Sequence, residues 1–506
     1  MTSVSDSAPF AASPSLFNMA RYVLAKASTH PDKEALAILG ATGAQSWSYG
    51  ALERAVRGTA TGLLQQGLVD GDRVLMRLGN TVEFPIVYLA CISVGLIPVP
   101  TSSQLTTTEV DWIVGQVTPA FVVQDPAISG PSAHIASLDA AALVDMHTFP
   151  AADYVMGDPE RLAYIIYTSG TSGTPRAVCH AHRAIWARQM MFDGWYGLTP
   201  QDRLLHAGAF NWTYTLGTGL MDPWTVGATA LIPAAGTPPD NLATLIRDAK
   251  ATIFAAAPGV YRQMLKSDNW PDTPDLRHGL SAGERLPDAT RARWEALSGT
   301  AVHEAYGMSE CSTFVSASPS HPAPPGATGR AQLGRRVALL GADGPVPQGE
   351  EGVIAVHRSD LGLMLGYLGQ TKETNARFQG DWFLTGDTGV MSEDGAITYL
   401  GRADDMMNAG GYRVSPLEVE AVLNSHPAIQ EAAAVELRVK SDVSIIAAIY
   451  VADTKLKEAD LNTFASDRLA RYKMPRIYIH RDSLPKSVNG KLNRSALRDQ
   501  YEADYG

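Results

Sequence analysis

Runs of apolar residues with helix-like and strand-like spacing alternate over most of the chain, and this alternation limits the fold more than any other feature. A helical pattern at 49–66 is followed by an extended run at 73–77 and a second helical pattern at 82–94. The alternation resumes with a strand pattern that starts at Leu162. Strands that alternate with helices form largely parallel sheets covered by helices. The sequence therefore predicts an α/β protein.

The pattern changes in the last third of the chain. At about 326–400 short β runs are separated by Gly-Asp turns, which is typical of a β-rich subdomain. A new unit with its own helices and strands begins near Asp404. We expect a large N-terminal domain, residues 1–403, built from two layered α/β subdomains and the β-rich subdomain. A small α+β lid, residues 404–506, follows it, and a cleft between two such units is a common place for a site.

Composition excludes several classes of protein. The 506 residues are 45% hydrophobic and 18% charged, so the chain can bury a large core and is not disordered. There are 41 Lys and Arg against 52 Asp and Glu, a net charge of −11. A nucleic-acid partner is not expected, because such proteins need a basic surface.

The cysteines and the apolar runs indicate the compartment. Cys91, Cys179 and Cys311 are widely separated, so neither a disulfide framework nor a cysteine zinc site follows, and a reducing cytosol is natural. Residues 1–14 lack the charge pattern of a signal peptide. The most apolar stretch, 84–100, is too short and too interrupted to span a bilayer. We expect a soluble cytoplasmic protein with no integral membrane segment, and a homodimer stays open.

The segment from Tyr167 to Arg176 is the sharpest chemical signal. An apolar strand runs into five hydroxyl residues, two glycines and a cation. Glycines let backbone N–H groups turn toward a ligand, and an arginine fork suits phosphate. The alternative is an ordinary flexible Ser/Thr/Gly loop. It is not a Walker loop, because no Gly-Lys-Ser/Thr follows, and no G-x-G-x-x-G motif follows a strand elsewhere.

Four further segments decide between these readings. They are Glu304–Glu310 (EAYGMSE), Trp382–Asp387 (WFLTGD), Gly401–Glu420 and Pro485–Leu492 (PKSVNGKL). Together with the loop, and in this order, they resemble the acyl-adenylate-forming superfamily, which includes acyl-CoA synthetases, peptide-synthetase adenylation domains and beetle luciferases. The resemblance covers essentially the whole chain from about residue 18.

The resemblance implies an ATP-dependent acid–CoA ligase. A carboxylic acid and ATP would give acyl-AMP and pyrophosphate, and CoA would then give acyl-CoA and AMP. ATP, Mg²⁺ and coenzyme A as co-substrate are the implied small molecules. Asp404 matches the hinge about which the family's mobile lid takes a second orientation. Catalysis of this kind is mostly positioning and charge stabilisation around phosphate.

The resemblance implies a large ATP/AMP site, in which the loop from Thr168 to Thr174 would cradle the β and γ phosphates. Its residues are Thr168, Ser169, Gly170, Thr171, Ser172, Gly173, Thr174, Arg176, Ala282, Gly283, Glu284, Glu304, Ala305, Tyr306, Gly307, Met308, Ser309, Asp387, Tyr399, Arg402 and Lys491. Tyr306 would lie against adenine and Asp387 would bind the ribose hydroxyls. Glu310 would hold Mg²⁺ with help from Thr168, and both count as catalytic. Arg176 stands where the family usually has lysine, which keeps the charge.

Lys491 is the implied catalytic cation. Its family counterpart reaches both the acid carboxylate and the α-phosphate, where it offsets their repulsion. Lys486, five residues earlier, is expected to be mainly exposed. The CoA arm would pass Gly410, Gly411 and Tyr412, since glycines leave room for a narrow channel. These glycines could instead serve only a tight turn.

The acid pocket is expected at Phe210, Asn211, Ala257, Pro258, Gly307 and Met308. Phe210 matches an aromatic gate. Asn211 stands where amino-acid-activating relatives carry Asp, and a neutral amide cannot pair with a substrate ammonium. A small to medium apolar acid, aliphatic or aromatic, is therefore expected.

Three other functions remain open on sequence. No carrier domain trails Gly506, which favours free CoA, but a stand-alone adenylating enzyme could load a separate carrier protein. A non-catalytic ATP sensor is disfavoured because Lys491, Asp387 and Glu310 are retained. A luciferase-like oxidase is the third.

Overall fold

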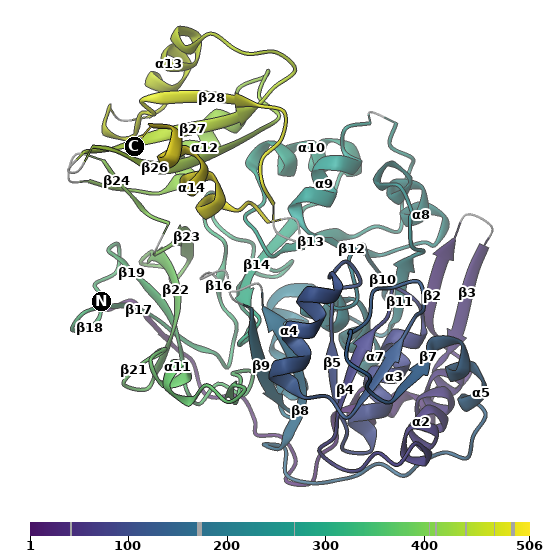
Figure 1. Ribbon diagram of the computed structural model, residues 1–506. Helices are drawn as coiled ribbons and strands as arrows, with labels where there is room; N and C mark the ends of the chain where they lie inside the picture. Colours follow the sequence, from purple (N-terminus) through teal and green to yellow (C-terminus); the bar gives the residue numbers. More distant parts are fainter. Residues whose placement is uncertain are drawn as a thin grey trace.

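The chain forms a large body and a smaller unit at its C-terminal end (Figure 1). The structure, a computed structural model, describes residues 1–40, 43–168, 175–267, 269–403, 405–409, 412–440, 443–469, 471–486 and 491–505. The body is built from layered sheets and helices, so the predicted α/β class is confirmed.

A nine-stranded sheet runs through the body in the order β16-β15-β14-β13-β12-β10-β11-β2-β3. Its strands are β2 (Glu34–Gly40), β3 (Gly43–Ser48), β10 (Arg203–His206), β11 (Thr229–Pro233), β12 (Ile253–Ala256), β13 (His278–Ala282), β14 (Val302–Met308), β15 (Ser312–Ser316) and β16 (Arg330–Ala331). The six strands from β14 to β2 pair in parallel. The helices that follow its strands include α7 (Asp222–Val226), α8 (Leu242–Asp248), α9 (Pro258–Met264) and α10 (Asp288–Ser298). Parallel pairing needs such crossovers, which the alternating pattern predicted.

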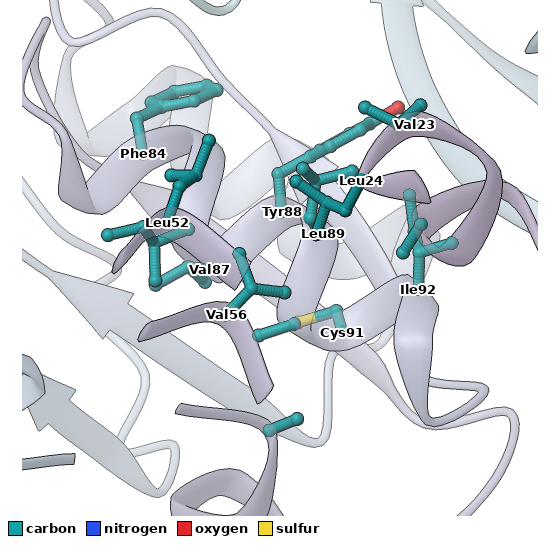
Figure 2. Packing of buried hydrophobic residues seen from close by; sticks show 14 of the residues in the cluster. Val23, Leu24, Leu52, Val56, Phe84, Val87, Tyr88, Leu89, Cys91 and Ile92 are labelled. Carbon is teal, nitrogen blue, oxygen red and sulfur yellow. The ribbon is translucent and has the colours of Figure 1, made fainter. Parts of the chain in front are cut away.

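A second, four-stranded parallel sheet has the order β5-β4-β6-β7. Its elements are β4 (Arg73–Arg77), β5 (Ile97–Pro100), β6 (Phe121–Gln124), β7 (Ser137–Asp139), with α2 (Tyr49–Gln65), α3 (Glu83–Ser93) and α4 (Thr107–Val117). Every residue of α3 from Phe84 to Ser93 is buried, and Figure 2 shows its side chains packed against α2 and α1 (Met19–Val23). The most apolar stretch is thus a buried helix and strand, as expected. No helix in the described part of the chain could cross a membrane.

Two antiparallel sheets complete the body. The seven-stranded one contains β1 (Val4–Asp6), β17 (Arg336–Gly341), β18 (Gly344–Pro345), β19 (Glu351–His357), β21 (Phe378–Gln379), β22 (Trp382–Met391) and β23 (Ile397–Arg402). The smaller one contains β8 (Leu162–Thr168), β9 (Arg176–Ala181) and β20 (Gly366–Tyr367). Strand β1 comes from the N-terminus and pairs with β17, a partnership that the sequence pattern did not reveal.

The C-terminal unit has a core of its own. It contains β24 (Met407–Ala409), β25 (Tyr412–Val414), α12 (Pro416–Asn424), β26 (Glu431–Lys440), β27 (Val443–Val451), α13 (Glu458–Ser466), β28 (Ile477–Arg481) and α14 (Arg494–Tyr505). Alternate residues of β26 face opposite sides. Ala434 packs in a cluster with Val419 of α12, and Val435 packs in another with Leu497 of α14. We call this unit the lid.

Candidate active site

The segments expected to bind adenine and acid meet at one edge of the nine-stranded sheet. Strands β10, β12, β13 and β14 are neighbours and parallel, so their carboxyl ends lie together. Ala257 follows β12, and Gly283 and Glu284 follow β13. Tyr306 lies in the last part of β14, one residue beyond the register pair of Ala282 and Ala305. Ligands of such sheets bind at the carboxyl ends of the strands.

Gly283 is a position where only glycine fits. Its φ is +98°, and a Cβ there would lie 2.8 Å from Cζ2 of Trp212. Trp212 belongs to the segment after β10, so the loops that follow β10 and β13 are in contact. The proximity of Trp212 to Gly283 has no local signal in the chain.

Tyr306 joins the parallel sheet to the β-rich sheet. Its hydroxyl donates to Oδ2 of Asp387 on β22 at 2.5 Å. Its ring stacks on Tyr399 of β23, with centroids 5.3 Å apart. The structure thus brings together three residues that were expected at the nucleotide from sequence segments about 80 and 90 positions apart.

Asp387 lies in a nearly closed environment. It is 7% exposed, and Nη1 of Arg402 donates to its Oδ1 at 3.2 Å. Burial raises the pKa of the Asp387 carboxyl, while Arg402, the Tyr306 hydroxyl and Lys491 oppose that rise. The carboxylate is held in place from two sides.

Glu310 belongs to a cluster of polar side chains beside the hairpin of β8 and β9. Its Oε1 accepts a hydrogen bond of 2.8 Å from the hydroxyl of Tyr367. The guanidinium of Arg176 lies 5.1 Å over the Tyr367 ring, and Arg176 pairs with Thr168 across β8 and β9. Arg176 and Glu310 therefore meet at Tyr367, a residue that the sequence did not indicate, and Thr168 is the strand partner of Arg176. Ser169, Gly170, Thr171, Ser172, Gly173 and Thr174 lie outside the described residues.

Lys491 places a positive charge between both sides of the body. It is half-buried, and it lowers the pKa of the Glu284 carboxyl and that of Asp387, against the rise that burial causes in each. Glu284 follows β13 and Asp387 lies on β22. Lys486 is exposed, as expected, although its ammonium pairs with Glu431 at 2.9 Å.

Glu304, an expected site residue, has two partners within the body. The Glu304 carboxylate accepts from the N–H of Leu286 at 2.6 Å and forms an ion pair with Arg291. Each Glu304 oxygen thus has a partner within the body, and a role of Glu304 at the nucleotide stays a prediction.

Phe210 also departs from its expected place. Its ring is 0% exposed and packs against Phe84 at 5.8 Å, in the hydrophobic core. A gate needs a face on an open pocket, so this burial argues against the gate. Asn211 and Ala257 are half-buried, and Pro258 is the buried first residue of α9.

The remaining expected residues fall into two groups. Gly307, Met308 and Ser309 are half-buried around the turn from β14 to β15. Asp404, Gly410 and Gly411 lie outside the described residues, and Tyr412 begins β25.

Comparison with known proteins defines the class. The profile of the AMP-binding enzyme family matches residues 23–368, and that of the AMP-binding enzyme C-terminal domain matches residues 418–491. The chain belongs to the AMP-binding enzyme family. The superfamily resemblance and the fold class expected from the sequence are both confirmed.

Particular relatives are CoA ligases by name. The human mitochondrial acyl-coenzyme A synthetase ACSM2A is 30% identical over 467 residues, which cover 86% of this chain and 81% of that protein. The crystal structure of the anthranilate CoA ligase AuaEII with anthranoyl-AMP superposes with a TM-score of 0.89 at 25% identity, covering 97% of this chain and 98% of that one. The benzoate CoA ligase from Burkholderia xenovorans LB400 gives a TM-score of 0.84 at 29% identity, covering 96% and 100%.

Proposed function

We propose that the protein is an AMP-forming acid–CoA ligase, which makes acyl-AMP and pyrophosphate from a carboxylic acid and ATP and then transfers the acyl group to CoA. Its relatives among acyl-CoA synthetases and aryl-CoA ligases support this reaction. The observation that carries it is the meeting of Tyr306, at the carboxyl end of β14, with Asp387, which Arg402 also holds. The relatives named here are CoA ligases, so loading of a carrier protein is not favoured.

Tyr306 and Asp387 form the proposed nucleoside subsite. A carboxylate offers about four lone-pair sites, so Asp387 can accept from ribose hydroxyls while it holds Tyr306 and Arg402. The Tyr306 ring, fixed by that hydrogen bond and by Tyr399, would present a rigid surface to adenine. Because Tyr306 and Asp387 hold each other in place, the subsite is preorganised, which reduces the entropy cost of binding.

Lys491 is the proposed catalytic residue of acyl-AMP formation. The acid carboxylate and the α-phosphate are both anionic and must come into contact. An ammonium between them offsets their repulsion, and a preorganised charge in a partly buried site acts more strongly than it would in water. Lys491 already lies near two body carboxylates in this lid orientation.

The chemistry of Glu310 and Thr168 fits Mg²⁺. Magnesium prefers oxygen ligands and keeps several waters, so one carboxylate and one hydroxyl are enough protein ligands. Oε2 of Glu310 accepts no hydrogen bond from the described residues, while Tyr367 holds Oε1. The ion, when bound, would neutralise phosphate charge. Among the described residues no group of three or more His, Cys, Asp or Glu is close enough to hold a metal.

The second half-reaction is proposed to use a rotated lid. We keep Asp404 as its hinge, with the body at 1–403 and the lid at 404–506, and Gly410 and Gly411 as the passage for the CoA arm. These assignments rest on the family resemblance. The cytoplasm remains the proposed compartment, because the three cysteines are free and buried.

A trapping assay tests the function. The enzyme with ATP, Mg²⁺ and a panel of carboxylic acids is treated with hydroxylamine, and the assay is repeated with CoA and analysed by mass spectrometry. We expect AMP release, a trapped hydroxamate, and an acyl-CoA product when CoA is present. A hydroxamate without any thioester would favour a carrier-protein acceptor, and no ATP-dependent product with any acid would contradict the proposal.

A further inference from the structure

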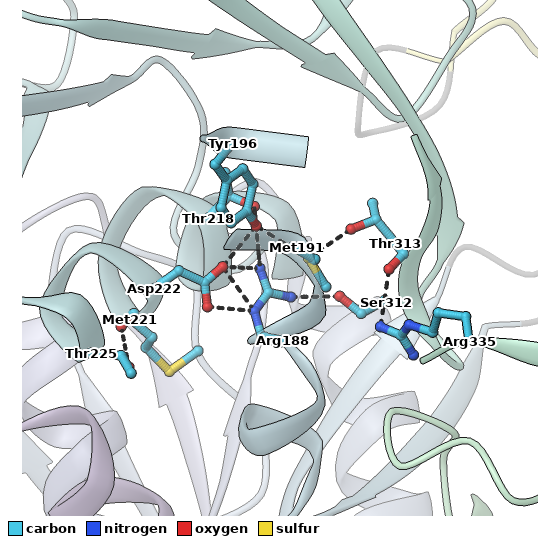
Figure 3. Close-up of polar contacts among 10 residues, drawn as sticks. All are labelled: Arg188, Met191, Tyr196, Thr218, Met221, Asp222, Thr225, Ser312, Thr313 and Arg335. Atoms are coloured by element: carbon cyan, nitrogen blue, oxygen red, sulfur yellow. Dashed lines mark hydrogen bonds and ion pairs between the residues drawn. The ribbon is translucent and has the colours of Figure 1, made fainter. Parts of the chain in front are cut away.

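A buried ion pair anchors a polar network in the body, shown in Figure 3. The guanidinium of Arg188 donates to the Asp222 carboxylate at 2.6–3.0 Å. It also donates to the hydroxyls of Tyr196, Thr218 and Ser312, at 3.1, 3.2 and 2.5 Å. Burial opposes the charge of Arg188, but Asp222 together with Tyr196 and Tyr164 outweighs burial, so the pKa of Arg188 is raised. The network therefore carries one balanced pair of charges.

A small cavity of about 20 Å³ lies beside this network. Tyr88, Tyr164, His180, Arg188, Thr213 and Ser309 are among its lining residues. A space of this size holds one group of about the size of a water molecule. The cavity is thus polar at Arg188 and too small for a whole acid.

Two lining side chains each carry one polar atom that is unpaired within the described part of the chain. The Tyr88 side chain is 0% exposed, and its hydroxyl is unpaired within the described part of the chain. Figure 2 shows Tyr88 on α3 among apolar side chains. His180 is 3% exposed, and its Nε2 lies 2.7 Å from the carbonyl oxygen of Ser309. That carbonyl can only accept, so Nε2 carries the proton and donates.

The unpaired atoms supply complementary chemistry. Nδ1 of His180 is then an acceptor, and it too is unpaired among the described residues. The Tyr88 hydroxyl can donate or accept. Buried polar groups are paired in most native structures, and an unpaired one costs free energy. A donor and an acceptor of this kind in the wall of one cavity point to a guest that both accepts and donates.

The cavity adjoins the segments expected to line the acid pocket. Thr213 lies two residues after Asn211, and Ser309 follows Met308 directly. Its other walls, including Tyr88 and Met19, belong to the interior of the body. With the acid pocket at those segments, the far end of a bound acid would point toward this cavity.

We propose that this cavity binds a hydroxyl group at the distal end of the acid, so that the substrates are hydroxylated acids rather than wholly apolar ones. The proposal rests on the proposed ligase function. The guest accepts from the Tyr88 hydroxyl and donates to Nδ1 of His180. It is neutral, because Asp222 already balances Arg188, and a further buried charge without a partner would be costly.

Matched acids test this pocket. The specificity constant kcat/KM for AMP release is measured with benzoate against 3- and 4-hydroxybenzoate, and with hexanoate against 6-hydroxyhexanoate. We expect the hydroxylated member of at least one pair to be preferred by about tenfold or more, the scale of one satisfied hydrogen bond. Tyr88→Phe should lower that preference about tenfold by slowing the hydroxylated acid, since it removes a hydroxyl without a protein partner.

A control variant and clear contrary outcomes complete the test. The Tyr478 hydroxyl in the lid is also buried and unpaired within the described residues, so Tyr478→Phe should leave the preference unchanged. The pocket proposal is overturned if the unhydroxylated acid is preferred in every pair. It is equally overturned if Tyr88→Phe does not alter the preference, which would mean that the cavity holds only a structural water. If none of the acids tested supports AMP release, the ligase function itself is contradicted, and this proposal falls with it.

Discussion

Glu431 of the lid lies 3.0 Å from the guanidinium of Arg262 on α9 of the body, so an ion pair joins the two units. Lys486 adds a second cation to the same carboxylate at 2.9 Å. The charges of Arg262, Glu431, Lys486 and Lys491 all act on Glu284. The lid orientation that brings Lys491 to the site is therefore held by electrostatic contacts next to it.

Arg262→Gln should weaken this orientation. Partly exposed ion pairs contribute about 0.2–1 kcal/mol, so acyl-AMP formation should slow by up to about fivefold. Thioester formation from supplied acyl-AMP should not slow, because the proposed rotation breaks the pair anyway. Single-turnover kinetics of each half-reaction measures this. Arg358→Gln, which removes an exposed pair with Asp381 within the body, is the control; an equal slowing in that variant, or of both half-reactions in Arg262→Gln, would refute the role of the pair.

Lys491→Ala should separate the half-reactions more sharply. Removing the ammonium leaves the two anions of the first step unscreened, and the loss of one preorganised electrostatic group costs about 10²–10³ in rate. Pyrophosphate release should fall by that factor, whereas thioester formation from supplied acyl-AMP should persist. Lys455→Ala, an exposed lysine of the same unit, should change neither rate. Equal loss in both steps would show that Lys491 is not specific to adenylation.

Tyr367→Phe should weaken Mg²⁺ binding without removing a metal ligand. The Tyr367 hydroxyl orients Oε1 of Glu310, and loss of such a supporting hydrogen bond lowers metal affinity by about 10–100-fold. The Mg²⁺ concentration for half-maximal AMP release should rise accordingly, with the maximal rate largely recovered at high Mg²⁺. Tyr154→Phe removes a comparable bond to Glu53, far from the site in sequence, and should leave the requirement unaltered. An unchanged requirement in Tyr367→Phe would contradict the assignment of Glu310.

The sequence predicted those parts of the molecule whose signals are local. Helix 49–66, strand 73–77 and the buried helix after Val82 follow from apolar spacing and match α2, β4 and α3. The motifs indicated Tyr306 and Asp387, and in the fold the Tyr306 hydroxyl lies 2.5 Å from Oδ2 of Asp387. Residues that contact the site but lie in no motif were missed, because their role depends on contacts with residues far away in the sequence.

Tyr367 and Arg188 are such partners. Tyr367 lies 57 positions from Glu310, and Arg188 lies 124 positions from Ser312. Nothing near either residue in the chain indicates these contacts. Phe210 is a different case, since its ring packs in the core, a contact that its motif does not indicate.

Gly283→Ala should disturb the nucleotide site. A φ of +98° is strained for alanine, and its Cβ would meet the Trp212 ring at 2.8 Å, so the loop must shift. Misplacement by about 1 Å lowers rates by up to about 100-fold, and kcat/KM for ATP should fall by about 10–100-fold. Gly115→Ala, in helix α4 with open space around its Cβ, should leave kcat/KM unchanged. Normal ATP kinetics in Gly283→Ala would show that the loop does not contact the nucleotide.

Buried neutral histidines should make the fold sensitive to acid. Burial lowers the pKa of His206 to about 3, and burial with neighbouring positive charge lowers those of His278 and His303 to about 4. Between these values and the ordinary pKa of about 6.5, the unfolded chain binds protons that the native chain does not. The free energy of unfolding therefore falls as the pH drops, by about 1.4 kcal/mol per pH unit for each such histidine.

His206→Leu isolates one of these contributions. Both ring nitrogens of His206 are unpaired among the described residues, and its ring packs on Tyr214. The free energy of unfolding, measured with urea from pH 7.5 to 5, should fall for the native protein. Below about pH 6 the fall should be shallower for His206→Leu by up to about 1.4 kcal/mol per pH unit. His134→Leu, on the exposed surface, should keep the native slope. If acid weakens His206→Leu as steeply as the native protein, the buried ring takes no part in the pH dependence.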